Sequence, residues 1–277
     1  MIAKQRTRQS AAPLKWHGGK SYLAERIVRM MPKHLHYVEP YFGGGAVFFR
    51  KPGHLIQGHS EVINDLYGEL VTFWRVLQSR ELFSEFQRRV ALTPFAKPLW
   101  EEAGRNVSSE PIDRAWAFFV RYRQSRQGLG RDFATMSRNR TRRGMNEQVS
   151  SWLSAIEGLP EAHERLSRVV IYDEPALDVI RREDGLQTFH YCDPPYLSAI
   201  RVVKDTYSRE MSDADHRELL TTLGGIQGKF QLSGYRSELY DEAAARFGWN
   251  RTDIAIDNKA SAQKNKPTKV ECLWANF

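Results

Sequence analysis

The sequence predicts an α/β fold with a seven-stranded, mostly parallel sheet and a mainly helical insertion. Short β-rich runs alternate with helical patterns over most of the chain, which is typical of parallel sheets with crossover helices. The last two β-rich runs are joined by a polar loop without a helical pattern, so we expect them to pair as an antiparallel hairpin. Between Glu81 and Arg165 the alternation stops and only helical patterns remain, which indicates an inserted domain.

The elements of the alternating part follow from local patterns. The β-rich runs cover 36–39, 55–64, 168–172, 188–192, 229–233, 252–256 and 270–276. Helical patterns cover 21–31, 66–77 and 212–223. The last of these begins at Ser212 with Asp215 three residues on, which resembles a capping box. The loop of the expected hairpin carries Lys259, Lys264, Lys266 and Lys269.

The insertion combines a buried helix with an arginine-rich stretch. Five apolar residues follow helical spacing and predict one buried face: Ile112, Ala115, Trp116, Phe119 and Val120. Between Arg121 and Arg143 there are eight arginines and one acid, Asp132, so this stretch carries a net charge of +7. A second helix is expected at 146–156. An irregular basic loop between two helices suggests a segment that reaches a substrate, although such a charge run can also be a solvated face.

Length and composition narrow the class of protein. The 277 residues exceed one typical domain, and 41% of them are apolar, enough for a sizeable core. No apolar run reaches the roughly 18 residues of a membrane-spanning helix, and the polar N-terminus lacks the pattern of a secretory signal. With only Cys192 and Cys272, a reducing, cytoplasmic setting is the simpler interpretation. The net charge of +8 suggests an anionic partner.

A glycine loop follows the first expected strand. The strand runs into Gly43-Gly44-Gly45 and then into an apolar helix, so a ligand can approach the backbone closely. The loop fails the dinucleotide fingerprint because Phe48 occupies the third glycine position. The run Gly19-Lys20-Ser21 fails the phosphate-loop pattern because Leu14 replaces its leading glycine. Asp65, after the second strand, can accept hydrogen bonds from ribose hydroxyls or cap the next helix.

The most specific motif is Asp193-Pro194-Pro195-Tyr196, directly after a buried strand. Two prolines cannot continue a sheet ladder, so the chain leaves the sheet in a stiff, extended form. The lone pair of adenine N6 is delocalised into the ring, which makes this amine a poor nucleophile. The Asp193 carboxylate and the Pro194 carbonyl can bind its two N–H groups and oppose the positive charge that develops on attack. Tyr196 can stack on an extruded base. A turn closed by a capping aspartate is the structural alternative.

Other reactive residue types receive structural interpretations. Cys192 precedes Asp193 but is expected to be a small core residue rather than a nucleophile. His34 and His36 have no third or fourth metal ligand nearby, so no metal site is expected.

Three motifs in order make the chain resemble the S-adenosylmethionine-dependent DNA adenine-N6 methyltransferases of the Dam type, the D12 class. Residues 13–20 are similar to the family's N-terminal cofactor segment, residues 39–45 to its glycine loop and residues 193–196 to its catalytic motif. A long insertion before the catalytic motif also matches. The stretch 137–143 resembles phage- and prophage-borne members more than cellular ones.

The resemblance implies a Rossmann-like methyltransferase fold that acts on double-stranded DNA by base flipping and direct transfer. The catalytic domain would comprise 1–80 and 166–277, and the target-recognition domain 81–165. Residues implied to bind S-adenosylmethionine are Trp16, Lys20, Glu39, Pro40, Gly43, Gly45, Asp65, Pro175 and Asp193. Residues implied to be catalytic are Asp193, Pro194 and Tyr196. Residues implied to contact DNA are Arg123, Arg126, Arg131, Arg138, Arg140, Arg142 and Arg143.

Some questions stay open from the sequence. Where the family has an acidic residue beside the cofactor adenine, the best register gives Pro175, with Asp173 two residues early, so the adenine contacts are open. RNA or protein acceptors are alternatives, although related glutamine methyltransferases carry Asn where Asp193 stands. A silent DNA-binding module is a third alternative, disfavoured by intact Asp193, Lys20 and Asp65. The oligomeric state and the recognition sequence cannot be read from the chain.

Overall fold

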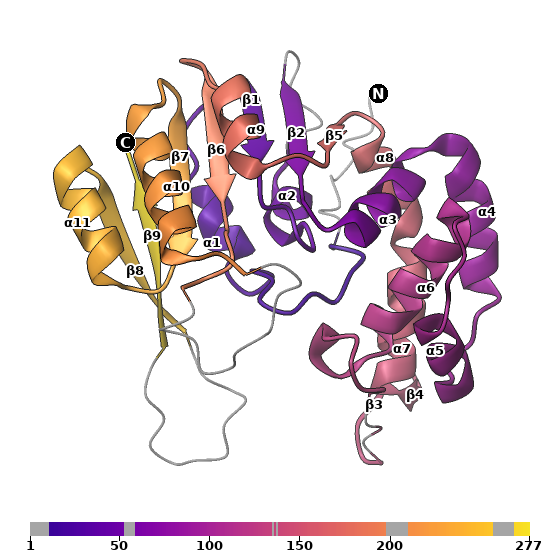
Figure 1. Ribbon diagram of the computed structural model, residues 1–277. Helices are drawn as coiled ribbons and strands as arrows, with labels where there is room; N and C mark the ends of the chain where they lie inside the picture. Colours follow the sequence, from indigo (N-terminus) through magenta and orange to yellow (C-terminus); the bar gives the residue numbers. More distant parts are fainter. Residues whose placement is uncertain (1–10, 53–58, 135, 137, 198–209, 257–268) are drawn as a thin grey trace, which may run out of the picture. The chain divides into compact units, whose positions relative to one another are not determined.

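Seven strands form one sheet in the order β5-β2-β1-β6-β7-β9-β8 (Figure 1). The strands are β1 (His36–Glu39), β2 (Ser60–Asn64), β5 (Val170–Tyr172), β6 (Thr188–Cys192), β7 (Lys229–Gly234), β8 (Asn250–Ile256) and β9 (Lys269–Ala275). β1 pairs in parallel with β2 and β6, and β6 with β7. β9 is antiparallel to both β7 and β8. The predicted sheet, with its terminal antiparallel hairpin, is therefore confirmed.

The computed structural model describes residues 11–52, 59–134, 136, 138–197, 210–256 and 269–277. The start of the expected strand at 55–64 and three of the loop lysines, Lys259, Lys264 and Lys266, lie outside these residues. The strand expected at 168–172 begins only at Val170, because Val169 N still donates to Leu166 O in a turn, 3.1 Å away.

Contacts divide the chain into two units. The first unit comprises Met1–Met30, Gly43–Gly58 and Asp65–Asp173, and the second Met31–Phe42, His59–Asn64 and Glu174–Phe277. None of the described helices is both long and apolar enough to cross a membrane.

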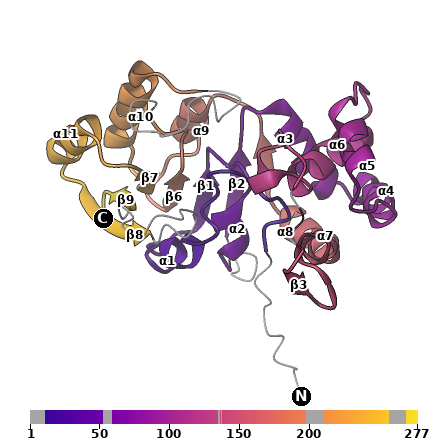
Figure 2. The same cartoon turned by 90° about the horizontal axis from the view of Figure 1, so that it is seen from below.

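In the second unit, three helices cover one face of the sheet (Figures 1 and 2). They are α9 (Ala176–Arg182), α10 (Asp213–Gly225) and α11 (Glu238–Phe247). Their apolar side chains, such as Leu219 and Tyr240, form one core with Phe230 of β7 and Trp274 of β9. The predicted capping box of α10 is present: Ser212 Oγ accepts from Asp215 N, and Ser212 N donates to the Asp215 carboxylate.

The first unit is mainly helical. Its helices are α1 (Ala24–Arg29), α2 (Ala46–Arg50), α3 (Gly68–Gln78), α4 (Arg80–Ala91), α5 (Lys97–Gly104), α6 (Pro111–Arg123), α7 (Glu147–Glu157) and α8 (Leu159–Leu166). α1 is shorter than the expected 21–31 because residues 21–23 form a turn. α3 packs against α6, with the rings of Phe73 and Phe119 stacked at 5.8 Å. The predicted buried face of α6 is confirmed, with Ile112 only half-buried.

The arginine-rich stretch after α6 contains more regular structure than its sequence suggested. A 3-10 turn (Arg126–Gly128) follows the helix, and β3 (Thr141–Arg142) and β4 (Met145–Asn146) form a two-stranded hairpin. α7 then begins one residue after the expected start, because the Asn146 side chain caps it by accepting from Gln148 N at 2.9 Å.

Candidate active site

Polar side chains meet at one edge of the sheet in the second unit. Glu39 ends β1, Asn64 ends β2 and Asp193 follows β6 directly. Because β1 is parallel to both β2 and β6, these residues lie at the same edge. Open α/β sheets bind ligands outside the carboxyl ends of their strands. The arrangement therefore fits the site that the sequence predicts here.

Asp193 is held by the residue that closes its own motif. The Tyr196 hydroxyl lies 3.2 Å from Asp193 Oδ1 and also donates to Glu271 of β9. Tyr196 is 7% exposed, and its ring packs edge-on against Tyr235 at 4.9 Å. Burial, with the Asp193 and Glu271 carboxylates, raises the pKa of Tyr196 well above its ordinary value, so its hydroxyl stays protonated. The phenol thus offers one proton between the carboxylates of Asp193 and Glu271.

Asn64 ties three segments of the same edge together. Its side-chain N–H donates to Pro40 O and Glu174 O, each at 3.0 Å, and its Oδ1 accepts from Glu174 N at 3.0 Å. The side chain is 1% exposed. Asn64 therefore fixes the chain at the end of β1 and just before α9, where Pro175, the expected neighbour of the cofactor adenine, is exposed.

Glu39 is a buried carboxylate. It accepts from the Tyr37 hydroxyl at 2.6 Å and is 2% exposed. Burial, followed by the Glu39 carboxylate, raises the pKa of Tyr37 well above its ordinary value. The Tyr37 hydroxyl therefore stays protonated and donates to Glu39 throughout the neutral range.

The glycine loop belongs to the first unit and lies against Trp16. A Cβ on Gly44 would be 2.5 Å from Trp16 Cβ, and one on Gly43 would be 2.9 Å from Trp16 Nε1. Gly43 also has a φ of +49°, which disfavours any larger residue. Its carbonyl accepts from Trp74 Nε1 at 3.2 Å. The glycines thus allow the Trp16 side chain to lie directly against the backbone of the loop.

Asp65 closes this loop rather than capping a helix. Its two carboxylate oxygens accept from Gly43 N at 2.8 Å and from Tyr67 N at 3.0 Å, whereas α3 has Tyr67 at its N-cap position. Burial raises the pKa of Asp65, and the backbone N–H groups of Tyr67, Gly43 and Leu66 oppose that shift. A carboxylate has about four acceptor positions, so these three backbone bonds leave about one for a ligand hydroxyl.

The N-terminal segment that carries Trp16 is packed on α6. The Trp16 ring stacks on Tyr122 at 5.0 Å and contacts Phe118 at 6.1 Å. Lys15 Nζ donates to Ser125 O at 3.2 Å, which fixes the segment against the residues after α6. Lys20 is 5% exposed and donates to Gly18 O at 3.2 Å, so its ammonium lies inside the turn that this segment makes.

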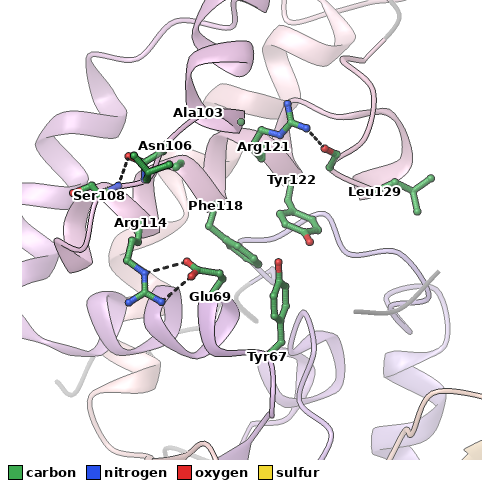
Figure 3. Close-up of a pocket in the computed structure, with 14 residues that line it drawn as sticks. Tyr67, Glu69, Ala103, Asn106, Ser108, Arg114, Phe118, Arg121, Tyr122 and Leu129 are labelled. Carbon is green, nitrogen blue, oxygen red and sulfur yellow. Dashed lines mark hydrogen bonds and ion pairs between the residues drawn. The ribbon is translucent and has the colours of Figure 1, made fainter. Parts of the chain in front are cut away.

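Beside this packing, the first unit has a pocket of about 470 Å³ (Figure 3). Its wall contains the bidentate ion pair of Arg114 with Glu69, with N–O distances of 2.8 and 3.2 Å. The Tyr67 and Tyr122 hydroxyls face each other, and burial and Tyr67 raise the pKa of Tyr122. The polar groups of the wall that dashed lines connect in Figure 3 are bonded to one another. This pairing favours a structural role for the pocket.

The seven arginines expected at DNA differ in their surroundings. Arg126, Arg131, Arg138, Arg140, Arg142 and Arg143 are exposed. Arg143 forms an ion pair with Glu157 at 2.8 Å, and Arg140 lies 3.6 Å from Glu147. Arg123 is half-buried and donates to Ser151 O at 2.7 Å, and burial lowers its pKa to about 10. Its guanidinium is thus directed at α7.

Cys192, His34 and His36, the residues considered for other chemistry, make contacts typical of structural residues. Cys192 is fully buried, which raises the pKa of its thiol and confirms it as a core residue. His34 Nδ1 lies 2.7 Å from Pro32 O, and His36 lies 2.7 Å from Ser60 Oγ and 3.1 Å from Glu183. Within the described ranges, no three histidine, cysteine or acidic side chains are grouped as metal ligands.

Three residues of these sites were missed by sequence reasoning. From the sequence, no role was assigned to Asn64, Tyr122 or Glu271. Each acts through partners far away in the chain, such as Glu174 for Asn64 and Tyr196 for Glu271. No local motif marks such contacts. The only available signal was the polar residue at the end of an apolar strand, which applies to Asn64.

Comparison with known proteins finds similarity to DNA adenine methyltransferases. Residues 16–107 match the family described as D12 class N6 adenine-specific DNA methyltransferase. A type II methyltransferase of Lactococcus lactis subsp. cremoris, M1.LlaDCHI, is 27% identical over 273 residues, which cover 92% of each chain. DNA adenine methylase of Escherichia coli (strain K12) is 27% identical over 204 residues, 68% of this chain and 66% of that protein. The DNA N-6-adenine-methyltransferase of Escherichia phage P1 is 38% identical over 65 residues, only 8% of its length.

Proposed function

We propose, for this member of the D12 class of N6 adenine-specific DNA methyltransferases, that the target amine is bound by Asp193 and Pro194 at the carboxyl edge of the sheet. The position of Asp193 directly after β6, at the carboxyl edge of the sheet, is the observation that carries this proposal. An extruded adenine presents two N–H groups, which the Asp193 carboxylate and the Pro194 carbonyl accept.

The Asp193 carboxylate and the Pro194 carbonyl favour the reaction because, unlike water molecules, they are held in fixed positions. N6 acquires positive charge as its lone pair leaves the ring and attacks the methyl group. A fixed carboxylate and a fixed carbonyl stabilise that charge without reorganising. Once N6 is methylated, its extra proton is lost. The Tyr196 ring, which is 7% exposed, stays the predicted stacking partner of the base.

S-adenosylmethionine is the proposed methyl donor, and its sulfonium supplies the electrophilic methyl group. Asp65 would accept from a ribose hydroxyl with the acceptor position that its backbone bonds leave. The Gly43–Gly45 backbone, with Trp16 against it, and the Lys20 ammonium would hold the methionine part. Glu39, Pro40 and Pro175 stay contacts of this ligand predicted from the sequence. The residues of the first unit named here therefore fit this cofactor.

We assign target recognition to residues 81–165 and catalysis to residues 1–80 and 166–277. Exposed arginines of the insertion would contact phosphates and guanine edges of double-stranded DNA. Arg126, Arg131, Arg138 and Arg142 are among the six that are exposed. Arg123 is assigned mainly to holding α7, and Arg140 and Arg143 would exchange their acidic partners for phosphate. A phage or prophage origin and action in the prokaryotic cytoplasm accord with the arginine-rich stretch and the phage P1 relative.

The proposal is tested with Asp193→Ala and, as a matched control, Asp178→Ala, which removes an exposed carboxylate on α9. Transfer of tritiated methyl groups to plasmid DNA free of adenine methylation should be abolished by the first change and kept by the second. Calorimetry should show S-adenosylmethionine binding to both variants. Equal loss of binding and transfer in Asp193→Ala would contradict the role of Asp193 as the acceptor of the amine.

A further inference from the structure

Glu271 lies at the edge of the sheet where Asp193 is located. β9 is antiparallel to β7, and Cys272 pairs with Gly234, the last residue of β7. Glu271 precedes Cys272, so it lies beyond the carboxyl end of β7. It is 1% exposed and accepts from the Tyr196 hydroxyl. Glu271 is near the start of β9 and reaches this edge because β9 is antiparallel to β7. In a parallel strand the first residues would lie at the opposite edge of the sheet.

The Tyr196 hydroxyl lies between two carboxylates but has only one proton. Glu271 accepts that proton, and Asp193 Oδ1 is 3.2 Å from the same oxygen. Tyr196 keeps its proton, because burial and both carboxylates raise its pKa well above the ordinary value. The two carboxylates therefore compete for one O–H group. Whichever carboxylate accepts the O–H has one acceptor position fewer for another donor.

We propose that Glu271 is a positioning residue for methyl transfer: by accepting the Tyr196 O–H, it keeps that O–H from taking an acceptor position on Asp193 that the target amine would use. The inference rests on the proposed role of Asp193. Without Glu271, the Tyr196 O–H turns to Asp193, occupies an acceptor position and partly neutralises the carboxylate. In this role Glu271 contacts neither the base nor the methyl donor and acts through Tyr196.

Four variants separate this role from a merely structural one. Glu271→Gln keeps an oxygen that can accept from Tyr196, whereas Glu271→Leu removes it. Tyr196→Phe removes the competing hydroxyl, and the double variant Tyr196→Phe with Glu271→Leu removes both polar partners. Single-turnover methylation of plasmid DNA free of adenine methylation, calorimetry with S-adenosylmethionine and thermal unfolding are measured for each variant.

Glu271→Leu should lower the single-turnover rate by roughly 10²-fold, the usual effect of losing one transition-state contact. Glu271→Gln should retain the rate within about threefold, and cofactor affinity should be unchanged in both. The diagnostic result is recovery: the double variant should be about tenfold faster than Glu271→Leu alone, because no hydroxyl remains to occupy Asp193. A double variant that folds but is no faster than Glu271→Leu would overturn the inference. Active Asp193→Ala would instead refute the proposed function on which it rests.

Discussion

Gly128 is the point at which the insertion contacts the N-terminal segment most tightly. A Cβ at this position would lie 2.1 Å from Lys15 O and 2.6 Å from Lys15 C, both backbone atoms. Gly128 also has a φ of +71°, in the left-handed region. Gly128→Ala therefore introduces both backbone strain and a steric clash. Since neither clashing atom is the end of a flexible side chain, the backbone at Lys15 must move, and Trp16 moves with it.

The size of the effect follows from these two costs. Alanine in the left-handed region costs about 1–2 kcal/mol. Overpacking against a well-packed neighbour adds about 1–3 kcal/mol. Gly144 has a φ of +73° but nothing within 4 Å of its would-be Cβ, so Gly144→Ala meets only the first cost. A difference of about 2 kcal/mol between the two variants corresponds to about 4–8 °C in Tm for a chain of this size.

Two measurements test this reasoning. Thermal unfolding should show a lower Tm for Gly128→Ala than for Gly144→Ala. Calorimetry should show S-adenosylmethionine affinity reduced about tenfold or more in Gly128→Ala, since each 1.4 kcal/mol of lost contact is about tenfold, and unchanged affinity in Gly144→Ala. Equal Tm values for the two variants would refute the steric argument. A lower Tm with normal S-adenosylmethionine affinity would show that the clash at Lys15 destabilises the chain without displacing Trp16.

Three further predictions concern charge, pH and capping. Replacing Arg138, Arg140 and Arg142 with alanine should weaken DNA binding and reduce the slope of log affinity against log salt by about three, as fluorescence anisotropy would measure; an unchanged slope would remove them from the interface. Burial lowers the pKa of His190 to about 4, so the free energy of unfolding should fall by up to about 3 kcal/mol as the pH drops from about 6.5 to about 4. His190→Leu should flatten this part of the profile in urea unfolding; a wild-type slope would contradict that assignment. Ser212→Ala should cost about 1 kcal/mol of stability in thermal unfolding by removing the α10 cap, and no loss would show that the capping box is dispensable.

The order of strands and helices could be predicted because each leaves a local pattern. The bounds of β1 and β6 agree with the expected 36–39 and 188–192, since a proline follows each strand within two residues and ends it. Boundaries defined by backbone bonds were less accurate, as with β5, which starts after a turn at Val169. The position of β9 between β7 and β8 also could not be read from the chain, because a hairpin pattern does not say which of its strands joins the sheet.

The site shows the same division between local and long-range information. Gly43–Gly45, Asp65 and Asp193 were found from motifs whose chemistry depends on neighbouring residues in the chain. Glu271 was not found, because its role depends on an antiparallel strand that returns to the Asp193 edge 75 residues after Tyr196. Charge counting likewise treated all arginines alike, whereas Arg123 bonds to the α7 backbone. Side-chain direction, not composition, decides which arginines can meet a phosphate.

Trp16 is the residue at which the predicted cofactor segment and the predicted recognition region meet. Its ring lies against Gly43 and Gly44, stacks on Tyr122 of α6 and has the tilted ring of Phe118 at 6.1 Å. A shift of α6 therefore changes the fit of the indole against the glycine loop. If DNA binding to the insertion alters α6, cofactor affinity must change, and by linkage cofactor binding alters DNA affinity by the same factor. Measuring the affinity for each ligand in the presence and absence of the other gives that coupling, and Tyr122→Ala, which removes the stacked ring, should reduce it towards zero.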